Sequence, residues 1–490
     1  MSQGDKKNIC IFSSLYAPSL GGVQTYTQNL AGALAGLGHN VSVICCNTNS
    51  QAAFEVTSGV RVHRIPCRNY LNGRFPVPKK GTHLKATLAE IAKRGVDYVV
   101  LNAKFYELTS IGAKFAREHG VAPILIEHGS AALTIGNPVL DVAVQSIEKY
   151  MTRRTMKYSP FCYGVSAKAS AWLSHFGIQA SGELYNSINA HQYAEAGASC
   201  NRDLRLELQL NNNDFLVCSI GRLVPEKGVL EIVEAAEILA NTQSSSGAAC
   251  SVSYSGVADR ANDTMSTKSV CSDNVNEHAN GASARACAKK AHGTSGNDSG
   301  AGADNANTQR NAGSASNAHS TSSDANSCAK GSSNSDSDSN KTSKIHFAIA
   351  GDGPLLSALK HLAATKNLSN VHILGRTTPA ESSALLSQSQ IYCLPSRSEG
   401  FATTLLEAAA CATPAIVTSV GGCDELIRNQ NFGTIIPNAK AATIAKAIEN
   451  ACATPEALAK QGENIRTLVQ QEFSWEKTAL AVLSACEEHN

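Results

Sequence analysis

The feature that most constrains this chain is an alternation of short apolar runs with helical stretches, which occurs twice along the sequence. Strands that alternate with helices form parallel sheets covered by helices. The pattern therefore predicts two doubly wound α/β domains, over residues 1–190 and 191–473. Strands are expected at 9–12, 41–46, 61–65, 98–101, 123–126 and 161–165, and then at 215–220, 345–350, 371–374, 391–394, 415–417 and 434–436.

Residues 241–344 depart from this pattern, because Ser, Asn, Ala and Gly dominate them and large apolar residues are scarce. Such a composition cannot bury enough apolar surface to offset the entropy of ordering the chain. We predict a disordered, low-complexity insertion in a surface connection between a helix and a strand of the second domain. The fold should tolerate it, because the entropy of loop closure grows slowly with loop length.

Charge and apolar patterning exclude several classes of protein. The formal net charge of the 490 residues is +2, which argues against a nucleic-acid-binding protein. No apolar run reaches the roughly 18 residues of a transmembrane helix, and the run at 9–12 is too short for a signal peptide, so a cytoplasmic location is expected. The 16 cysteines are scattered without a CxxC pair, which favours reduced, buried thiols over a metal site.

Cations and glycines follow three predicted strands of the second domain, where ligands of open α/β sheets bind. Arg222 and Lys227 lie in the turn after 215–220, and this turn opens a helix, as phosphate-binding turns do. Gly351 and Gly353 follow the next strand, and Arg376 follows the third. Each feature alone also fits an ordinary surface loop or turn.

A pair of carboxylates follows the strand at 391–394. Glu399 lies in a loop with Gly400 and Phe401, which can offer backbone N–H groups near a helix start. Glu407 is about one turn into that helix, on a face that can look back at the loop. A surface position explains either carboxylate alone. Together with the nearby cations, the two predict a site for a ligand that carries hydroxyls and phosphates.

The first domain offers fewer candidates. Gly21 and Gly22 form a turn between the first strand and a helix, which suits an anion, but the GxGxxG dinucleotide pattern is missing. His128 follows the strand at 123–126 and lies beside Gly129. Both a structural and a functional role for this histidine stay open.

These residues together resemble the retaining glycosyltransferases of family 4, which have the GT-B fold of two Rossmann-like domains facing a cleft. The resemblance covers nearly all of the chain outside the insertion. Its most specific part is the spacing of Glu399 and Glu407 within residues 395–422. It also implies that a last helix, at about 474–490, crosses back to the first domain.

The resemblance implies a role for each candidate residue. Arg222 and Lys227 would hold the diphosphate of a nucleotide-sugar donor, and Glu407 its ribose. Glu399 would lie against the donor sugar, and His128 near the anomeric carbon and the acceptor. No metal or other cofactor is expected, because cations and helix N-termini would neutralise the leaving diphosphate. Further donor contacts are expected from Gly21, Gly22, Gly351, Gly353 and Arg376 and from the amides of Gly400, Phe401 and Ala402.

The expected activity is transfer of a sugar from a UDP- or GDP-linked donor to a hydroxyl of a glycan or lipid-linked glycan of the cell envelope. Basic residues outnumber acidic ones over 61–94, where they form either a solvated surface or a face for an anionic membrane at the inner side of the cell. Two alternatives stay open: a sugar-nucleotide epimerase on the same scaffold, and a non-catalytic protein that binds sugar nucleotides.

Overall fold

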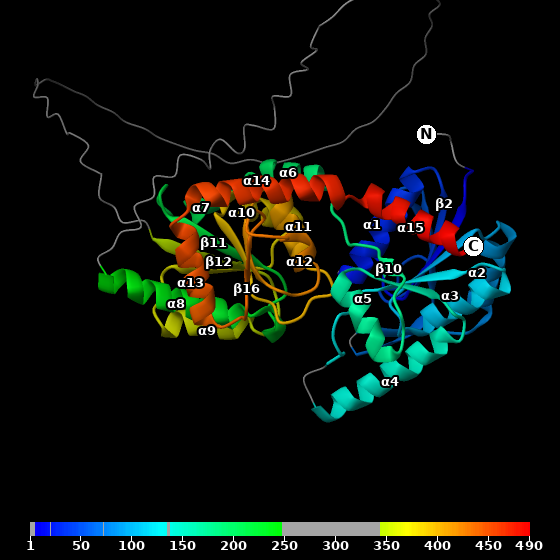
Figure 1. The fold of residues 1–490 in the computed structure, drawn as a ribbon. Helices are drawn as coiled ribbons and strands as arrows, with labels where there is room; N and C mark the ends of the chain where they lie inside the picture. Colours follow the sequence, from blue (N-terminus) through cyan, green and yellow to red (C-terminus); the bar gives the residue numbers. More distant parts are fainter. Residues whose placement is uncertain (1–4, 20, 72, 135–137, 247–343) are drawn as a thin grey trace, which may run out of the picture. The chain divides into compact units, whose positions relative to one another are not determined.

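The computed structural model describes residues 5–19, 21–71, 73–134, 138–246 and 344–490 (Figure 1). Most of the predicted insertion lies outside the described residues. Its first part does not, and there the prediction is wrong at the boundary: helix α8 (Val229–Ser246) continues past residue 241. Among the described residues, no helix is both long and apolar enough to cross a membrane.

The first sheet has eight strands in the order β10-β9-β8-β7-β1-β2-β4-β3. All neighbours are parallel except β3 and β4. A separate antiparallel hairpin, β5–β6, lies beyond β4 in the sequence. The strands are β1 (Asn8–Ser13), β2 (Asn40–Cys46), β3 (Phe54–Thr57), β4 (Val60–Ile65), β5 (Cys67–Tyr70), β6 (Phe75–Pro78), β7 (Tyr98–Asn102), β8 (Pro123–Glu127), β9 (Phe161–Gly164) and β10 (Gly182–Glu183).

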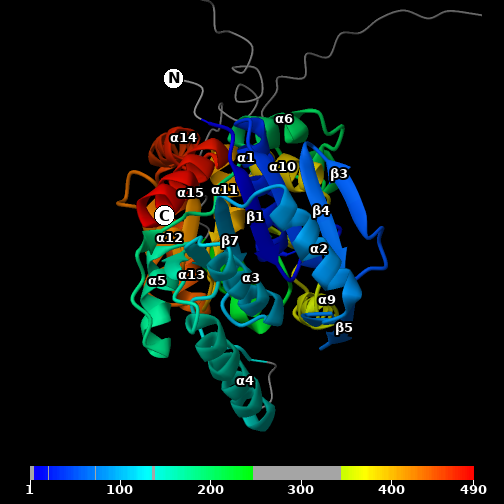
Figure 2. The same ribbon diagram turned by 90° about the vertical axis from the view of Figure 1, so that its right-hand side faces the viewer.

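Helices connect these strands and cover the sheet (Figures 1 and 2). They are α1 (Gly22–Gly36), α2 (Thr82–Lys93), α3 (Glu107–Glu118), α4 (Pro138–Met156), α5 (Ala167–Leu173) and the 3₁₀ helix η1 (Ser174–Phe176). Two further helices, α6 (Ala190–Ala198) and α7 (Leu204–Glu207), lead to the second sheet.

The second sheet has six parallel strands in the order β13-β12-β11-β14-β15-β16. Its strands are β11 (Phe215–Ile220), β12 (Ile345–Ala350), β13 (Val371–Gly375), β14 (Ile391–Leu394), β15 (Ala415–Thr418) and β16 (Thr434–Ile436). Its helices are η2 (Pro225–Lys227), α8, α9 (Leu356–Thr365), α10 (Pro379–Gln388), α11 (Thr403–Ala410), α12 (Cys423–Leu426), α13 (Ala441–Cys452), α14 (Pro455–Glu472) and α15 (Trp475–His489).

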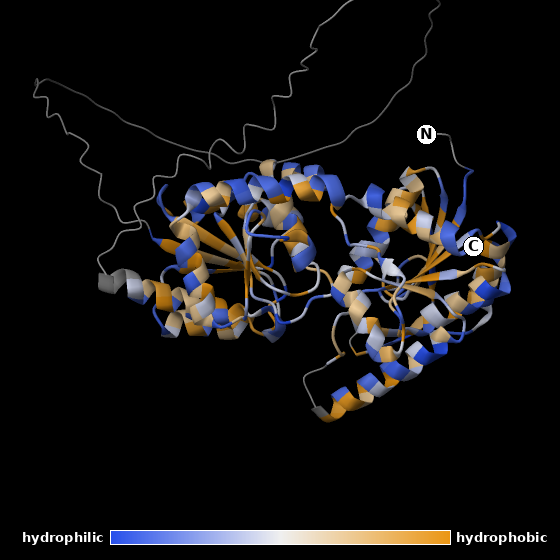
Figure 3. Cartoon of the chain, viewed as in Figure 1, coloured by the Kyte–Doolittle hydropathy of each residue, from blue (hydrophilic) through white to orange (hydrophobic). Residues whose placement is uncertain are grey.

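The predicted strands are confirmed. Most of them are apolar on both faces, and helices bury both faces of the sheet. All residues of β7, β8, β11 and β14 are buried, and Figure 3 shows the apolar strands inside both halves. The pattern missed β3, β5, β6 and β10. Strands β3 and β5 are mostly exposed, β6 alternates between half-buried and buried residues, and β10 has only two residues, so none of them shows a continuous buried apolar run.

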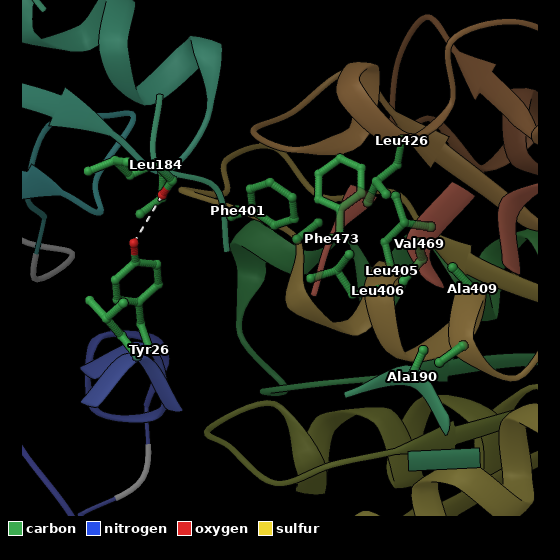
Figure 4. Packing of buried hydrophobic residues seen from close by; sticks show 14 of the residues in the cluster. Tyr26, Leu184, Ala190, Phe401, Leu405, Leu406, Ala409, Leu426, Val469 and Phe473 are labelled. Carbon is green, nitrogen blue, oxygen red and sulfur yellow. Dashed lines mark hydrogen bonds between the residues drawn. The ribbon is translucent and has the colours of Figure 1, made fainter. Parts of the chain in front are cut away.

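One buried apolar cluster runs through both halves of the fold. Figure 4 shows part of it: Tyr26 of α1 donates a hydrogen bond to the carbonyl of Leu184 at 3.1 Å, and Phe401 packs beside Phe473. Helix α15 then packs on α1, with Trp475 edge-on to Tyr26. The chain therefore returns to the first sheet, as the resemblance implied.

The basic residues at 61–94 do not all form one free surface. Arg64 is buried and binds Glu55 at 2.6 Å. Lys80 pairs with Glu107 at 2.5 Å, and Arg94 pairs with Glu90. Exposed basic side chains without an ion pair among the described residues remain at Arg68, Arg74, Lys79, Lys85 and Lys93.

Two helical glycines should respond in opposite ways to alanine. A Cβ on Gly112 of α3 would lie 2.5 Å from Phe12 Cγ and 2.8 Å from Leu101 Cδ2, so Gly112→Ala should cost about 1–3 kcal/mol of unfolding free energy. A Cβ on Gly32 of α1 meets nothing within 4 Å, so Gly32→Ala should stabilise the fold by roughly 0.5–1 kcal/mol. Urea unfolding of both variants tests the packing of α3; equal shifts of the same sign would contradict it.

Candidate functional site

The strand order predicts a ligand site in each half. In the second sheet, the direction of strand succession reverses between β11 and β14, and ligands of open α/β sheets bind beyond the carboxyl ends of strands at such a point. The loops that follow β11 and β14 carry Arg222, Lys227 and Glu399. In the first sheet, the corresponding point lies between β1 and β7.

The two loops of the second sheet are packed backbone against backbone. Gly228, in the left-handed region at φ 67°, lies so close to the carbonyl of Pro395 that a Cβ would overlap it. Arg397 donates its N–H to the carbonyl of Glu226 at 2.7 Å and its guanidinium to that of Pro225 at 2.6 Å. This contact holds η2 against the loop after β14.

The packing brings Lys227 and Glu399 into an ion pair. Lys227 Nζ binds Glu399 Oε1, which also accepts a hydrogen bond from Ser396 Oγ at 2.8 Å. The two paired side chains are 15% and 12% exposed, so the pair is close to solvent yet partly desolvated. A cation and a carboxylate therefore lie side by side at the edge of the sheet.

Glu407 of α11 belongs to the same site. Its carboxyl accepts a hydrogen bond from the Tyr193 hydroxyl at 3.1 Å. Burial raises the pKa of Glu407 to about 7, and both the hydrogen bond from Tyr193 and the positive charge of Lys227 oppose that rise. The carboxyl therefore titrates near neutral pH in the protein without ligand.

Residues of the first half hold the backbone of the Glu399 loop. Ser130 Oγ donates to the carbonyl of Glu399, and Ser166 Oγ donates to the carbonyl of Gly400 at 2.7 Å. The carbonyl of His128 lies against Gly400, where a Cβ would overlap it. The two halves therefore meet at the loop that carries the acidic residue of the ion pair.

His128 is a neutral side chain in a buried hydrogen-bond network. Its Nε2 lies 2.8 Å from Asn102 Oδ1, while Asn102 Nδ2 donates to Thr27 at 3.1 Å, so Nε2 carries the proton. The ring packs edge-on against Tyr26. Burial lowers the pKa of His128 to about 4, although the charge of Glu127 opposes this.

Arg222 faces a cavity of about 880 Å³ on the side of the first sheet. Its side chain is exposed, and its guanidinium forms no hydrogen bond or ion pair within the described part of the chain. Ser19 and Gln24, which flank the predicted Gly21–Gly22 turn, line the same cavity. The cation and this turn therefore face one space.

Three residues predicted to contact the donor have backbone N–H groups that already form hydrogen bonds in this structure. The N–H of Ala402 donates to the carbonyl of Gly421 at 2.9 Å, so it is not available to a ligand here. The N–H groups of Gly351 and Gly353 are likewise bonded, to Gly375 and to the side chain of Asp352. These two glycines let the loops after β11 and β12 approach closely.

The remaining predicted contacts have different surroundings. The N–H groups of Gly400 and Phe401 form no hydrogen bond to a described residue. The ring of Phe401, by contrast, points into the apolar cluster beside Phe473 (Figure 4). Arg376 is exposed at the end of β13, and Gly22 begins α1.

No sequence pattern marks several residues that shape the site. Ser130, Ser166 and Tyr193 bind across the two halves or across helices, and only the folded chain brings them to their partners. Lys104 also escaped notice, although it lies directly after β7 at the point where the strand order reverses. That position in the topology was the signal that could have found it.

The raised pKa of Glu407 predicts a pH-dependent cost to stability. The folded state keeps a proton that the unfolded chain loses between its ordinary pKa of 4.5 and about 7, so the free energy of unfolding falls over this interval as pH rises. Glu407→Gln removes that fall. We expect its Tm to match wild type near pH 5 and exceed it by roughly 5 °C near pH 8.

Thermal unfolding across this pH range measures the effect, with the exposed Glu456→Gln as the matched control. A constant Tm difference between Glu407→Gln and wild type at all pH values would contradict a buried, proton-binding Glu407.

Two family models match the chain. The glycosyl transferase 4-like domain matches residues 21–160, and glycosyl transferases group 1 matches residues 334–468. Together these matches cover more than half of the chain. An uncharacterized glycosyltransferase of Methanocaldococcus jannaschii is 33% identical over 153 residues, which are 30% of this chain and 42% of that relative's length.

Solved structures share the fold of this chain. The sucrose-phosphate synthase of Thermosynechococcus elongatus has a TM-score of 0.62 at 16% identity, covering 99% of each chain. An Anabaena protein solved in complex with UDP-glucose has a TM-score of 0.58 at 13% identity, covering 98% of this chain and 99% of its own. The chain therefore belongs to the family 4-type, group 1 glycosyltransferases and has their two-domain GT-B fold.

Proposed function

We propose that the protein is a retaining glycosyltransferase that moves a sugar from a UDP- or GDP-linked donor to a hydroxyl of a glycan or lipid-linked glycan of the cell envelope. The observation that carries this proposal is the Lys227–Glu399 ion pair, set beside Glu407 at the point where the strand order reverses. A relative named as a glycosyltransferase and a structural neighbour solved with UDP-glucose support it.

The ion pair suits a ligand that has an anionic part beside a part rich in hydroxyls. A donor diphosphate takes over Lys227, and Glu399 then accepts hydrogen bonds from sugar hydroxyls. Each charged group keeps a partner during this exchange, so neither side chain is left desolvated and unpaired. Arg222 has no other charged partner among the described residues and adds a second cation.

Breaking the bond between the sugar and the phosphate leaves an oxocarbenium-like sugar and a diphosphate with increased negative charge. Arg222 and Lys227 stabilise that charge, and the N–H groups of Gly400 and Phe401, which donate to no described residue, add further donors from the loop of Glu399. We propose that these groups replace a metal ion. Neutral His128 lies beside the same loop, and its proton on Nε2 is held by Asn102, which fixes the orientation of the ring.

The role of the cations is tested by Arg222→Ala and Lys227→Ala. Removing one partner of a charged contact costs about 2–5 kcal/mol, so kcat/KM should fall by roughly 30-fold to several thousand-fold. Activity of wild type should persist in a chelator. The measurement is sugar transfer from a panel of nucleotide sugars. The control is Arg466→Ala, which removes a surface ion pair with Glu463.

Losses below about threefold in both variants, or activity that depends on added divalent metal, would contradict the mechanism. Release of an altered nucleotide sugar without an acceptor would instead identify an epimerase. Donor binding without turnover would identify a non-catalytic binding protein.

We also propose that the protein acts at the cytoplasmic face of a membrane. Arg68, Arg74, Lys79, Lys85 and Lys93 are exposed and unpaired among the described residues. Helix α4, which Figure 3 shows with apolar residues near its start, adds exposed Val139, Val142 and Tyr150 in the same half. Each basic residue near an anionic surface contributes about 1 kcal/mol of binding.

Charge reversal tests this surface. The triple variant Arg68→Glu, Lys85→Glu and Lys93→Glu should lose co-sedimentation with anionic vesicles while keeping sugar transfer to a soluble acceptor. The matched control reverses Lys360, Lys440 and Lys460, which are exposed and form no ion pair with a described residue in the second half. Equal binding of wild type to anionic and neutral vesicles would contradict the proposal.

A further inference from the structure

A second cluster of charges lies buried at the point where the strand order of the first sheet reverses. Lys104, directly after β7, binds Glu148 of α4 at 2.8 Å and approaches Glu127 at the end of β8 at 3.3 Å. The three side chains are 1%, 3% and 2% exposed, respectively. Two carboxyl groups therefore share one ammonium group.

The two carboxylates differ in how fully they are bonded. Glu127 accepts the N–H of Lys104 at 3.1 Å and the N–H of Gly129 at 2.9 Å, in addition to its contact with the ammonium group. Glu148 binds Lys104 through Oε1, and its other oxygen forms no hydrogen bond to a described residue. Glu148 lines the 880 Å³ cavity, whereas Glu127 does not.

The cavity wall around Glu148 suits a sugar ring with an apolar substituent. Phe75 and Phe105 are parallel, with ring centroids 6.3 Å apart, and Tyr106 lies beside both. Such faces pack on the C–H side of a sugar ring and on hydrocarbon. Asn49 and Asn69 add groups that bind hydroxyls, and Arg222 reaches the same space from the donor side.

We propose that Glu148 is an acceptor-binding residue, whose free carboxylate oxygen accepts a hydrogen bond from a hydroxyl of a sugar-bearing acceptor. The proposal rests on the proposed function, because it assigns this cavity to the acceptor of the same reaction. Lys104 holds the carboxylate in place through Oε1 and leaves Oε2 for the ligand. No sequence motif singles out Glu148. Its side chain is almost wholly buried, so exposure does not single it out either.

A purely structural salt bridge is the competing explanation, and a matched variant separates the two. Glu107 is also a buried, ion-paired glutamate: it holds α4 through Arg154 at 2.6 Å, yet it does not line the cavity. Glu148→Gln and Glu107→Gln should both lower the Tm, because each removes one partner of a buried pair. Only Glu148→Gln should weaken acceptor binding.

The probes are hexyl glycosides of glucose, galactose and mannose, with 1-hexanol as the probe that has the same tail and no ring. Calorimetry gives their Kd values for wild type and both variants. For at least one glycoside, we expect Glu148→Gln to raise the Kd about tenfold or more and to leave the Kd of 1-hexanol unchanged. Glu148→Asp, which withdraws the carboxylate by one methylene, repeats the test should Glu148→Gln not fold.

A Kd for Glu148→Gln within about twofold of wild type, an equal loss in Glu107→Gln, or no binding of any glycoside to wild type would overturn the proposal. These outcomes are distinct from failure of the proposed function. If wild type binds a glycoside through Glu148 but transfers no sugar to it from any nucleotide sugar, the transferase assignment fails and the binding site stands.

Discussion

The structure depends on the close approach of backbones around the loop that carries Glu399. Gly228, Gly400 and Gly421 each lie against a neighbouring carbonyl where a Cβ would overlap it. These contacts bring the cation of one loop to the carboxylate of the next, and they let serines of the first half bind the same segment. A side chain at any of the three positions would separate the groups on which the proposed chemistry depends.

The ion pairs of the two halves differ in how deeply they are buried. At the second sheet, Lys227 and Glu399 are partly exposed, so a ligand can exchange partners with them at modest desolvation cost. At the first sheet, Lys104, Glu127 and Glu148 are almost fully buried, and breaking any of their contacts is expensive. The first arrangement suits groups that change partners during a reaction, and the second suits groups that must keep one position.

Much of the fold could be predicted from the sequence, because a strand buried on both faces, such as β11 or β14, leaves a continuous apolar run. The positions of Arg222, Lys227 and Glu399 followed from the same runs, since each lies just beyond one. The contacts made by Ser130, Tyr193 and Glu148 could not be predicted in this way. Their partners are far away in the chain, and a serine or glutamate on a helix or loop has no local pattern that reveals its partner.

Two hydrogen bonds anchor the residue that precedes β12. Lys344 directly precedes β12. Its N–H is held by the carboxylate of Asp214 at 3.0 Å, and its carbonyl accepts the N–H of Phe215. This anchorage is at the amino end of the second sheet, about 20 Å of strand away from the edge at which Lys227 and Glu399 lie. A fluorescent reporter attached at residue 344 would therefore be far from that ion pair.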